Sequence, residues 1–207
     1  MSLSSYRPFL DDPDDIARFE GQRFVVLRAT GAVVDAHSYV RSLLKPRITH
    51  PDAAYLPEAH VTLAGFPKGT DVESVRALVA EWAQSVAPLR LEVEKADYFP
   101  APFQIVILRI RKTKPLCDAL VSLRTRARDR GLGDGGMVRA ADWIFHTSVA
   151  YCAPLSRQEW AAVTAFVDGL AVPAAQCVVG DVEVVGLDNG QEHSAAFALS
   201  ASPNPSS

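Results

Sequence analysis

The chain has 207 residues, of which 48% are hydrophobic and 22% charged, and its formal net charge at pH 7 is -3. This composition is typical of a globular domain and excludes fibrous and wholly disordered chains. The slightly negative charge argues against a protein that coats duplex DNA, because such binding depends on a dominant basic surface. No apolar run reaches the roughly 20 residues of a membrane-spanning helix, and the polar start lacks a signal core, so we expect a cytoplasmic protein without a membrane partner.

Strand-like runs rich in Val, Ile and Phe alternate with helix-like runs along the chain. In the first half the predicted order is β-α-β-α-β, over residues 23–28, 35–45, 60–66, 71–86 and 89–99. The second half repeats this order over residues 104–110, 115–130, 144–152, 157–170 and 176–187, and a last strand follows at 194–200. The acidic start, residues 1–21, and the Ser- and Pro-rich end, residues 201–207, are predicted to be flexible.

The two halves keep their landmarks at matching distances from His60 and His146, as a duplicated unit should. Ten residues after each histidine comes a predicted helix cap that begins a capping box. The two predicted boxes are Thr70 with Glu73 and Ser156 with Glu159. Aligning residues 25–28 with 106–109 gives an offset of 81, against 86 between the histidines, so the second half carries five extra residues before its histidine. The glycine-rich residues 131–136 are the predicted place for them.

The duplicated pattern predicts an α+β fold of two similar lobes, each a mainly antiparallel sheet backed by helices, which face each other across a central cleft. The repeats cover about residues 22–99 and 103–200. Because each half is too small for generous independent stability, we expect one bilobal domain, residues 22–200, whose lobes share strands or a continuous interface.

Each half contains a histidine followed two residues later by a hydroxyl residue. The two segments read His60-Val61-Thr62-Leu63 and His146-Thr147-Ser148-Val149. In a strand, positions i and i+2 share a face, so each histidine and its hydroxyl residue point the same way, toward the predicted cleft, while their neighbours point toward the helices. Thr147 is the polar exception on the helix side.

These segments resemble the paired H-x-[ST]-x motifs of the 2H phosphoesterase superfamily, which includes bacterial 2'-5' RNA ligase-like proteins and cyclic phosphodiesterases. The resemblance covers about residues 22–200, and residues 59–66 look like a typical first motif. The second motif departs from the pattern, because Thr147 replaces the usual apolar residue and Ser148 replaces the commoner threonine. The resemblance implies a duplicated bilobal fold with a phosphodiester substrate and with His60, Thr62, His146 and Ser148 as the catalytic residues.

The chemistry of these side chains agrees with that implication. Two histidines can act as base and acid near neutral pH, and the hydroxyls of Thr62 and Ser148 can donate hydrogen bonds to the non-bridging phosphate oxygens. We therefore expect a metal-independent phosphodiesterase without a cofactor, acting as a monomer on a cyclic nucleotide phosphate or a 2'-5' linkage in RNA or a nucleotide. A symmetric pair also works in reverse, as a 2'-5' ligase, and the sequence does not assign which histidine is the base.

Several alternatives stay open at this point. The histidines could be structural strand residues, the fold could be a noncatalytic RNA- or nucleotide-binding module, or the chain could be a metal-dependent hydrolase, although a catalytic zinc site usually has three protein ligands and no third ligand suggests itself. The other three histidines, His37, His50 and His193, lack the hydroxyl partner. The three cysteines, Cys117, Cys152 and Cys177, are odd in number and lack C-x-x-C spacing, so they are predicted to be reduced, mostly buried thiols.

Two further features have a plain and a functional interpretation. Residues 131–136 match G-x-G-x-x-G, but they follow a helix and precede a strand, which is the reverse of the dinucleotide-binding context, so they predict a mobile loop near the cleft. Residues 109–130 carry eight basic side chains, which indicates either a solvated helix or a patch for the RNA backbone. Lys68 and Arg139 are candidates to contact a substrate phosphate, and Trp143 is a candidate to stack on a base.

Overall fold

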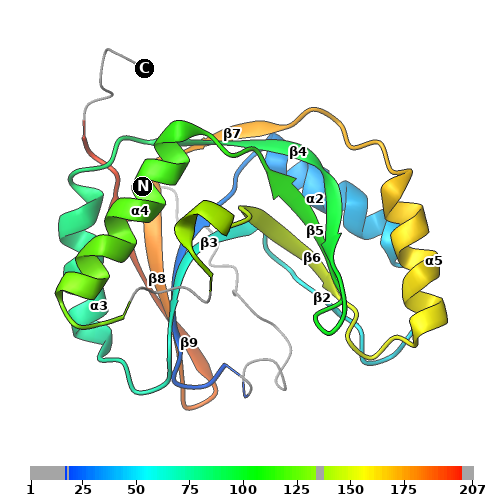
Figure 1. Ribbon diagram of the computed structural model, residues 1–207, viewed down its shortest axis with the longest axis horizontal. Coiled ribbons are helices and arrows are strands. Elements are labelled where there is room, and N and C mark those ends of the chain that lie inside the picture. The colour runs from blue at the N-terminus through cyan, green and yellow to red at the C-terminus, as the bar shows by residue number, and fades with distance from the viewer. Residues whose placement is uncertain (1–16, 18, 134–137, 202–207) are drawn as a thin grey trace.

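The computed structural model describes residues 17, 19–133 and 138–201, and its elements follow the order shown in Figure 1. The described elements are β1 (Arg23–Arg28), α2 (Ala32–Leu44), β2 (Ala54–Tyr55), β3 (His60–Phe66), α3 (Val72–Ala83), β4 (Leu89–Phe99), β5 (Ile105–Ile110), α4 (Lys114–Asp129), the short 3-10 helix η1 (Ala140–Asp142), β6 (His146–Tyr151), α5 (Arg157–Asp168), β7 (Gln176–Val179), β8 (Asp181–Asp188) and β9 (Gln191–Ala198).

The strands form two antiparallel sheets, in the orders β3-β1-β8-β9 and β2-β6-β5-β4-β7. Helices α3 and α4 pack beside the first sheet, and α2 and α5 pack beside the second. In Figure 1 the two sheets diverge downward from β4 and β7, with one pair of helices on each outer side. The predicted α+β architecture of two antiparallel sheets backed by helices is therefore confirmed.

Each sheet combines strands from both halves of the sequence. Strand β4 belongs to the first half but pairs with β5, and β8 belongs to the second half but pairs with β1. Helices cross over in the same way, since α2 packs near β6 and α4 packs near β3. Neither half of the sequence thus contains a complete sheet with its own helix layer.

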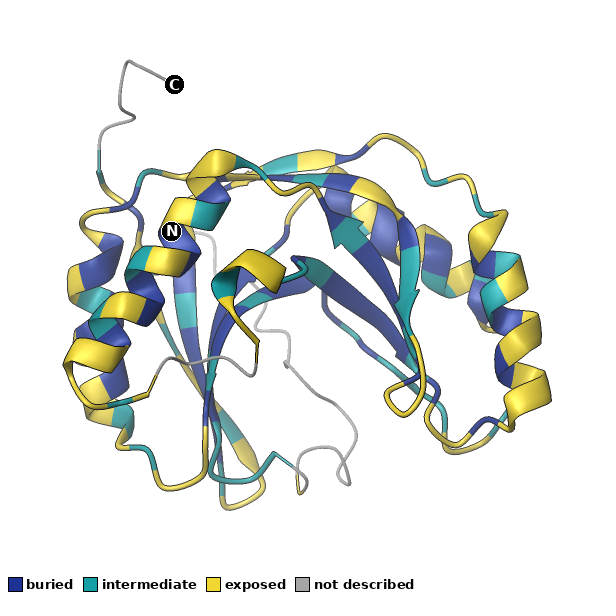
Figure 2. Cartoon of the chain, in the orientation of Figure 1, coloured by how far each residue is buried: buried dark blue, intermediate teal, exposed yellow. Residues whose placement is uncertain are grey.

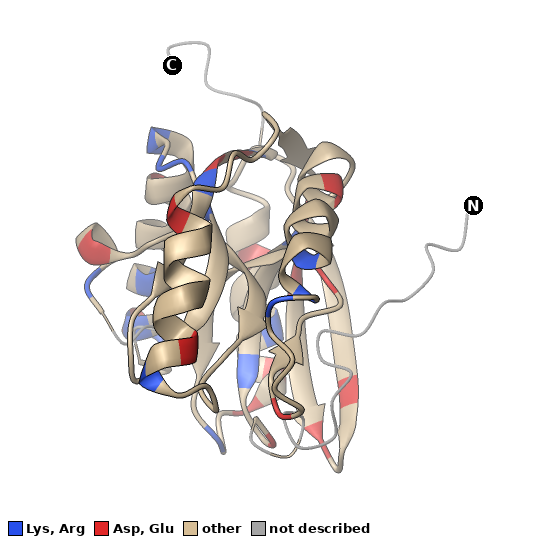
Figure 3. Cartoon of the chain, turned by 90° about the vertical axis from the view of Figure 1, so that its right-hand side faces the viewer, with Lys and Arg blue, Asp and Glu red and all other residues tan. Residues whose placement is uncertain are grey.

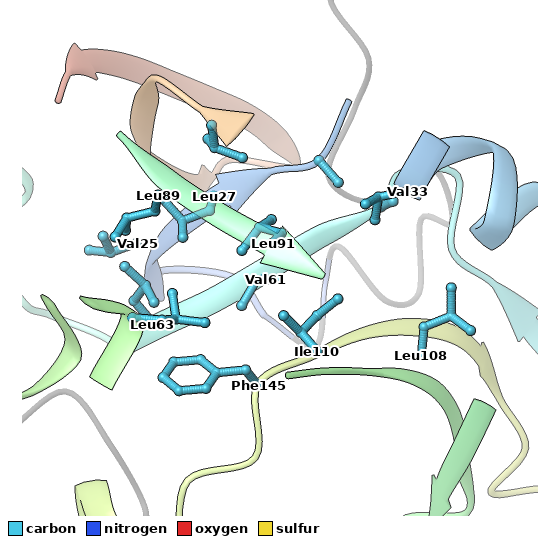
Figure 4. Close-up of a cluster of buried hydrophobic side chains, with 14 of the residues drawn as sticks. Val25, Leu27, Val33, Val61, Leu63, Leu89, Leu91, Leu108, Ile110 and Phe145 are labelled. Carbon is cyan, nitrogen blue, oxygen red and sulfur yellow. The ribbon is translucent and has the colours of Figure 1, made fainter. Parts of the chain in front are cut away.

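A hydrophobic core lies between the sheets and the helices. Val25 and Leu27 of β1 and Val61 and Leu63 of β3 are fully buried in it, and Leu91 of β4 packs among them (Figure 4). Figure 2 shows the same division on α3, α4 and α5, with buried residues toward the sheets and exposed residues outward. The alternation of buried and open positions along β1 and β3 turns the remaining side chains of these strands to the opposite face of the sheet.

One predicted capping box is confirmed and the other is wrong. Ser156 accepts a hydrogen bond from the backbone N–H of Glu159, and the Glu159 carboxylate accepts one from the backbone N–H of Ser156. Helix α3 instead begins one residue later than expected, because Asp71 accepts from the backbone N–H of Ser74. Thr70 does not cap the helix, since its hydroxyl donates to the carbonyl of Pro67 in the preceding turn.

The strand predicted over residues 176–187 is two strands. Gly180 separates β7 from β8, and the chain passes there from the second sheet to the first. The last strand begins at Gln191 and not at residue 194, because Asn189 and Gly190 both adopt positive φ and close a two-residue hairpin. Asn-Gly is the strongest short hairpin signal, and it extends the pairing of β8 with β9 up to the turn.

Several sequence-based predictions fall where the structure describes little or nothing. The predicted flexible segments 1–21 and 201–207 lie mostly outside the described residues, and so do residues 134–136 of the glycine-rich segment 131–136. All three cysteines are free, with Cys152 buried and the other two half-buried. Burial raises the pKa of the Cys152 thiol to about 12. Within the described ranges, none of the helices has both the length and the apolar character needed to cross a membrane.

Candidate active site

The two histidine motifs lie on neighbouring strands, because β3 contacts β6 at the junction of the two sheets. Val61 and Leu63 alternate with His60 and Thr62 along β3, and the two apolar residues are fully buried in the core. His60 and Thr62 therefore point away from the core side of the sheet. The same alternation on β6 separates His146 and Ser148 from Val149.

The strand pairing places the two histidines in equivalent positions. His60 lies opposite Arg28 in the ladder of β1 with β3, and His146 lies opposite Arg109 in the ladder of β5 with β6. Two residues further along, Thr62 lies opposite Val26, as Ser148 lies opposite Ile107 on the other sheet. Arg28 and Arg109 are the residues that the sequence offset of 81 already aligned.

A bulge follows each hydroxyl residue at the same place. The register of β1 with β3 shifts after Thr62, so Leu63 has no partner, and the register of β5 with β6 shifts after Ser148, so Val149 has none. Bulges bend a strand and re-aim its side chains, and they are common beside active sites. The repeated bulge gives both motifs the same local geometry, which the sequence pattern alone did not predict.

The ring of His146 is fixed by the backbone and by an aromatic neighbour. Its Nδ1 lies 2.8 Å from the carbonyl oxygen of Ile144, and since a carbonyl only accepts, Nδ1 carries the proton and Nε2 keeps the free lone pair. The ring of Phe99 packs edge-on, with centroids 4.8 Å apart. Burial lowers the pKa of His146, and the Ile144 carbonyl opposes that shift.

The side chain of His60 is buried, with only 6% of the residue exposed. Burial lowers its pKa to about 3. The positive charge of Arg28, and the charges that His146 and His37 carry when they are protonated, act in the same direction, and the backbone of Glu58 opposes them. The electrostatic influence of His146 on His60 reflects their proximity, because interactions between charges weaken with distance. Both histidines of the free protein are therefore neutral at pH 7.

A third histidine lies behind the site. His37 of α2 is buried, and its Nε2 donates to the backbone carbonyl of Ser148 at 3.0 Å. Burial lowers the pKa of His37, so the ring is neutral and its hydrogen bond connects α2 to β6 at the second motif. Sequence reasoning missed this role, although His37 falls on the helix face of Val33, Val40 and Leu44, where a lone polar residue needs a buried partner.

The two arginines opposite the histidines have different acidic partners. Arg28 contacts Glu183 at 2.7 Å, Glu192 at 3.3 Å and Glu58 at 3.9 Å. Arg109 contacts Asp97 of β4 at 2.5 Å. The first motif is thus next to a carboxylate-rich cluster, and the second is next to one carboxylate, Asp97, which also pairs with Lys95. The partners of Arg28 on β8 and β9, Glu183 and Glu192, were also missed, because these strands are far from β1 in the sequence.

The basic segment is mostly occupied with internal contacts, which favours its structural interpretation. Arg124 is buried, donates to the carbonyl of Val138 and stacks on Trp143, with the guanidinium carbon 4.3 Å from the ring centroid. Arg126 and Arg130 both pair with Glu81. In the view of Figure 3, basic and acidic positions are scattered over the elements without a stripe of one sign.

The other residues considered for a role in substrate binding or catalysis have contacts elsewhere or are exposed. The Lys68 side chain lies against the backbone of Gly21, and Arg139 forms an exposed ion pair with Asp142 at 2.8 Å. His193 is exposed on β9, and His50 lies 3.9 Å from the Asp52 carboxylate. In the described part of the chain, no group of three or more His, Cys, Asp or Glu side chains is arranged to hold a metal ion.

A family model described as the 2'-5' RNA ligase superfamily matches residues 17–191. The chain belongs to this superfamily. The resemblance to 2H phosphoesterases is thereby confirmed, and membership of the superfamily supports a phosphoesterase activity in general. None of the curated proteins matches the sequence.

Several solved structures have a similar fold at low sequence identity. The protein TT0787 of Thermus thermophilus has a TM-score of 0.64 and 16% identity, covering 86% of this chain and 97% of its own. E. coli LigT complexed with NADP+ has a TM-score of 0.56 and 15% identity, covering 88% and 99%. Usb1 of Kluyveromyces marxianus has a TM-score of 0.53 and 10% identity, covering 87% and 99%. These likenesses establish the shared fold.

Proposed function

We propose that the chain is a phosphodiesterase that hydrolyses cyclic nucleotide phosphates or 2'-5' linkages in RNA or nucleotides, with His60 and His146 as its acid–base pair. The observation that carries the proposal is their equivalence. Each histidine lies opposite an arginine, two residues before a hydroxyl side chain and a bulge, on adjacent strands of a duplicated fold. A structural histidine has no reason to recur with all of these neighbours.

In the proposed reaction, one imidazole takes a proton from water as the water oxygen attacks phosphorus. The bond from phosphorus to the ribose oxygen breaks, and the other histidine, protonated, gives its proton to that oxygen. Thr62 and Ser148 donate hydrogen bonds to the non-bridging oxygens, where negative charge increases in the transition state. The products are a phosphomonoester and a free ribose hydroxyl, and the reverse sequence of steps is a ligation.

The neutral histidines of the free protein can act as a base, but a general acid must first be protonated. Both histidines are neutral there, so one of them must gain a proton when substrate binds. The negative charge of the bound phosphodiester favours that protonation, because a nearby opposite charge raises a histidine pKa. Burial lowers the pKa of both histidines, and the positive charge of Arg28 lowers the pKa of His60 further.

The test is turnover of 2',3'-cyclic mononucleotides and a 2'-5'-linked adenylate oligomer, measured with EDTA present. His60→Ala and His146→Ala should each lower kcat by about 100- to 10,000-fold, the usual contribution of one general acid or base. His193→Ala, which removes an exposed histidine of β9, is the matched control and should keep full activity.

The other outcomes point to the alternatives. Turnover equal to that of the wild type in both histidine variants would refute the acid–base pair. Turnover that EDTA abolishes would indicate a metal-dependent hydrolase. Binding of the nucleotides without any turnover would favour the noncatalytic binding module.

A further inference from the structure

A cavity of about 610 Å³ adjoins the candidate active site. It lies between the end of β1, the start of α2 and the connection of β7 with β8. Arg28 and Glu58 form its wall on the side of His60, since Arg28 pairs with His60 across the strands and Glu58 precedes it by two residues. Its volume is within the range of pockets that enclose small organic ligands. A substrate whose phosphate lies at His60 can therefore extend into this space.

The charged lining of the cavity is mostly acidic. The lining includes four acidic residues, Asp35, Glu58, Asp181 and Glu183, and one basic residue, Arg28. Arg28 is already paired with Glu183 and with Glu192 outside the lining. The side chains of Asp35 and Asp181 form no hydrogen bond or ion pair with the residues that the structure describes. These two carboxylates are thus available as acceptors, and together they oppose the entry of a second anion.

The start of α2 does not offset this negative charge. A helix N-terminus favours anions, but Asp35 occupies the first turn of α2 and supplies a carboxylate at that end. The rest of the lining includes apolar surface, because Val34 and Val178 border the cavity and Val178 is 58% exposed. The cavity therefore offers apolar contact together with hydrogen-bond acceptors and a net negative charge.

These properties fit a nucleoside better than a phosphate chain. A base has apolar faces and amino donors, and a ribose has hydroxyl donors, whereas a further phosphate would meet Asp35 and Asp181. We propose that the cavity binds the uncharged nucleoside part of the substrate and excludes a second phosphate, so that the preferred substrates are small nucleotide esters and not continuous RNA strands. This proposal rests on the proposed function, because it takes the phosphate to lie between the two histidines.

The test compares the Kd values of 3'-AMP and adenosine 3',5'-bisphosphate by calorimetry at low salt. A diesterase cleaves neither compound, and either phosphate of the bisphosphate can occupy the site, so its other phosphate enters the cavity in both orientations. We expect the bisphosphate to bind at least about tenfold more weakly than 3'-AMP, because its second phosphate lies beside carboxylates of the same charge. In the double variant Asp35→Asn/Asp181→Asn, the ratio of the Kd of the bisphosphate to the Kd of 3'-AMP should approach one. Asp168→Asn, the same change at the exposed end of α5, should keep the wild-type ratio.

Each result decides the proposal. Equal or tighter binding of the bisphosphate, a ratio unchanged in the double variant, or no binding of 3'-AMP would overturn it. If the double variant does not fold, raising NaCl from low to high concentration gives a second reading, because screening should shrink the wild-type ratio and a salt-independent ratio would contradict the charge argument. Turnover without this discrimination refutes the cavity proposal alone, and discrimination without turnover refutes the proposed function alone.

Discussion

Replacing His60 with asparagine should make the fold less sensitive to acid. The pKa of His60 falls from 6.5 to about 3 on folding, so the unfolded chain binds more protons below pH 6.5. Stability therefore rises with pH in this window, and the contribution of His60 is lost as pH falls below 6.5. Keeping His60 neutral in the folded chain lowers the free energy of unfolding by only about 0.2 kcal/mol at pH 7. At pH 5 it lowers the free energy of unfolding by about 2 kcal/mol, because the histidine of the unfolded chain is then almost fully protonated.

The estimate at pH 5 changes little if the folded pKa is 4 instead of 3, since the histidine stays neutral in the folded chain in both cases. Urea denaturation at pH 7, 6 and 5 measures the free energy of unfolding of the wild type, His60→Asn and His193→Asn. The His60 variant should lose about 2 kcal/mol less than the wild type between pH 7 and pH 5. The variant of exposed His193 should follow the wild type. Parallel pH curves for the wild type and His60→Asn would refute the assignment of His60 as a buried neutral histidine.

Three shorter predictions concern buried polar groups beside the site and the N-cap of α3. Thr147→Val should stabilise the fold by about 1 kcal/mol in urea denaturation, because the Thr147 hydroxyl is fully buried and has no hydrogen-bond partner among the described residues; a destabilised variant would mean that the hydroxyl is paired. His37→Leu should cost about 1–3 kcal/mol, since it removes the buried donor to the carbonyl of Ser148, and an unchanged unfolding midpoint would contradict that hydrogen bond. Asp71→Ala should lower the melting temperature while Thr70→Ala leaves it unchanged, and the reverse order would restore the cap expected from the sequence.

The local parts of the fold could be read from the sequence because their signals are local. The strands of both motifs begin at the histidines, and β1, β3 and β4 have the predicted bounds. Apolar alternation fixes which side chains share a face, so His60 was correctly grouped with Thr62. The errors were also local, as at Thr70, where two adjacent polar residues compete to cap one helix and the turn hydrogen bond to Pro67 decides between them.

Pairing between distant strands could not be predicted in the same way. The periodicity of apolar residues predicts that β4 and β8 are strands, but it does not predict which sheet each strand joins. Two of the three acidic partners of Arg28, Glu183 and Glu192, lie on β8 and β9, more than 150 residues away, and the hydrogen bond of His37 crosses from α2 to β6. The surroundings of the candidate site, and with them the perturbed pKa of His60, follow from this long-range arrangement and not from either motif.

The exchange of strands between the halves has a consequence for how such a site can be asymmetric. Consider two separate copies of one half in which a late strand of each copy pairs with the first strand of the other, as β4 pairs with β5 and β8 pairs with β1 here. They would form an intertwined homodimer with a two-fold axis between the histidines. Symmetry would then make both histidines identical, since every substitution would appear twice. Joining the copies into one chain removes that constraint. Arg28 can acquire three acidic neighbours while Arg109 keeps one, and a pair of equivalent imidazoles can diverge into two groups with different proton affinities.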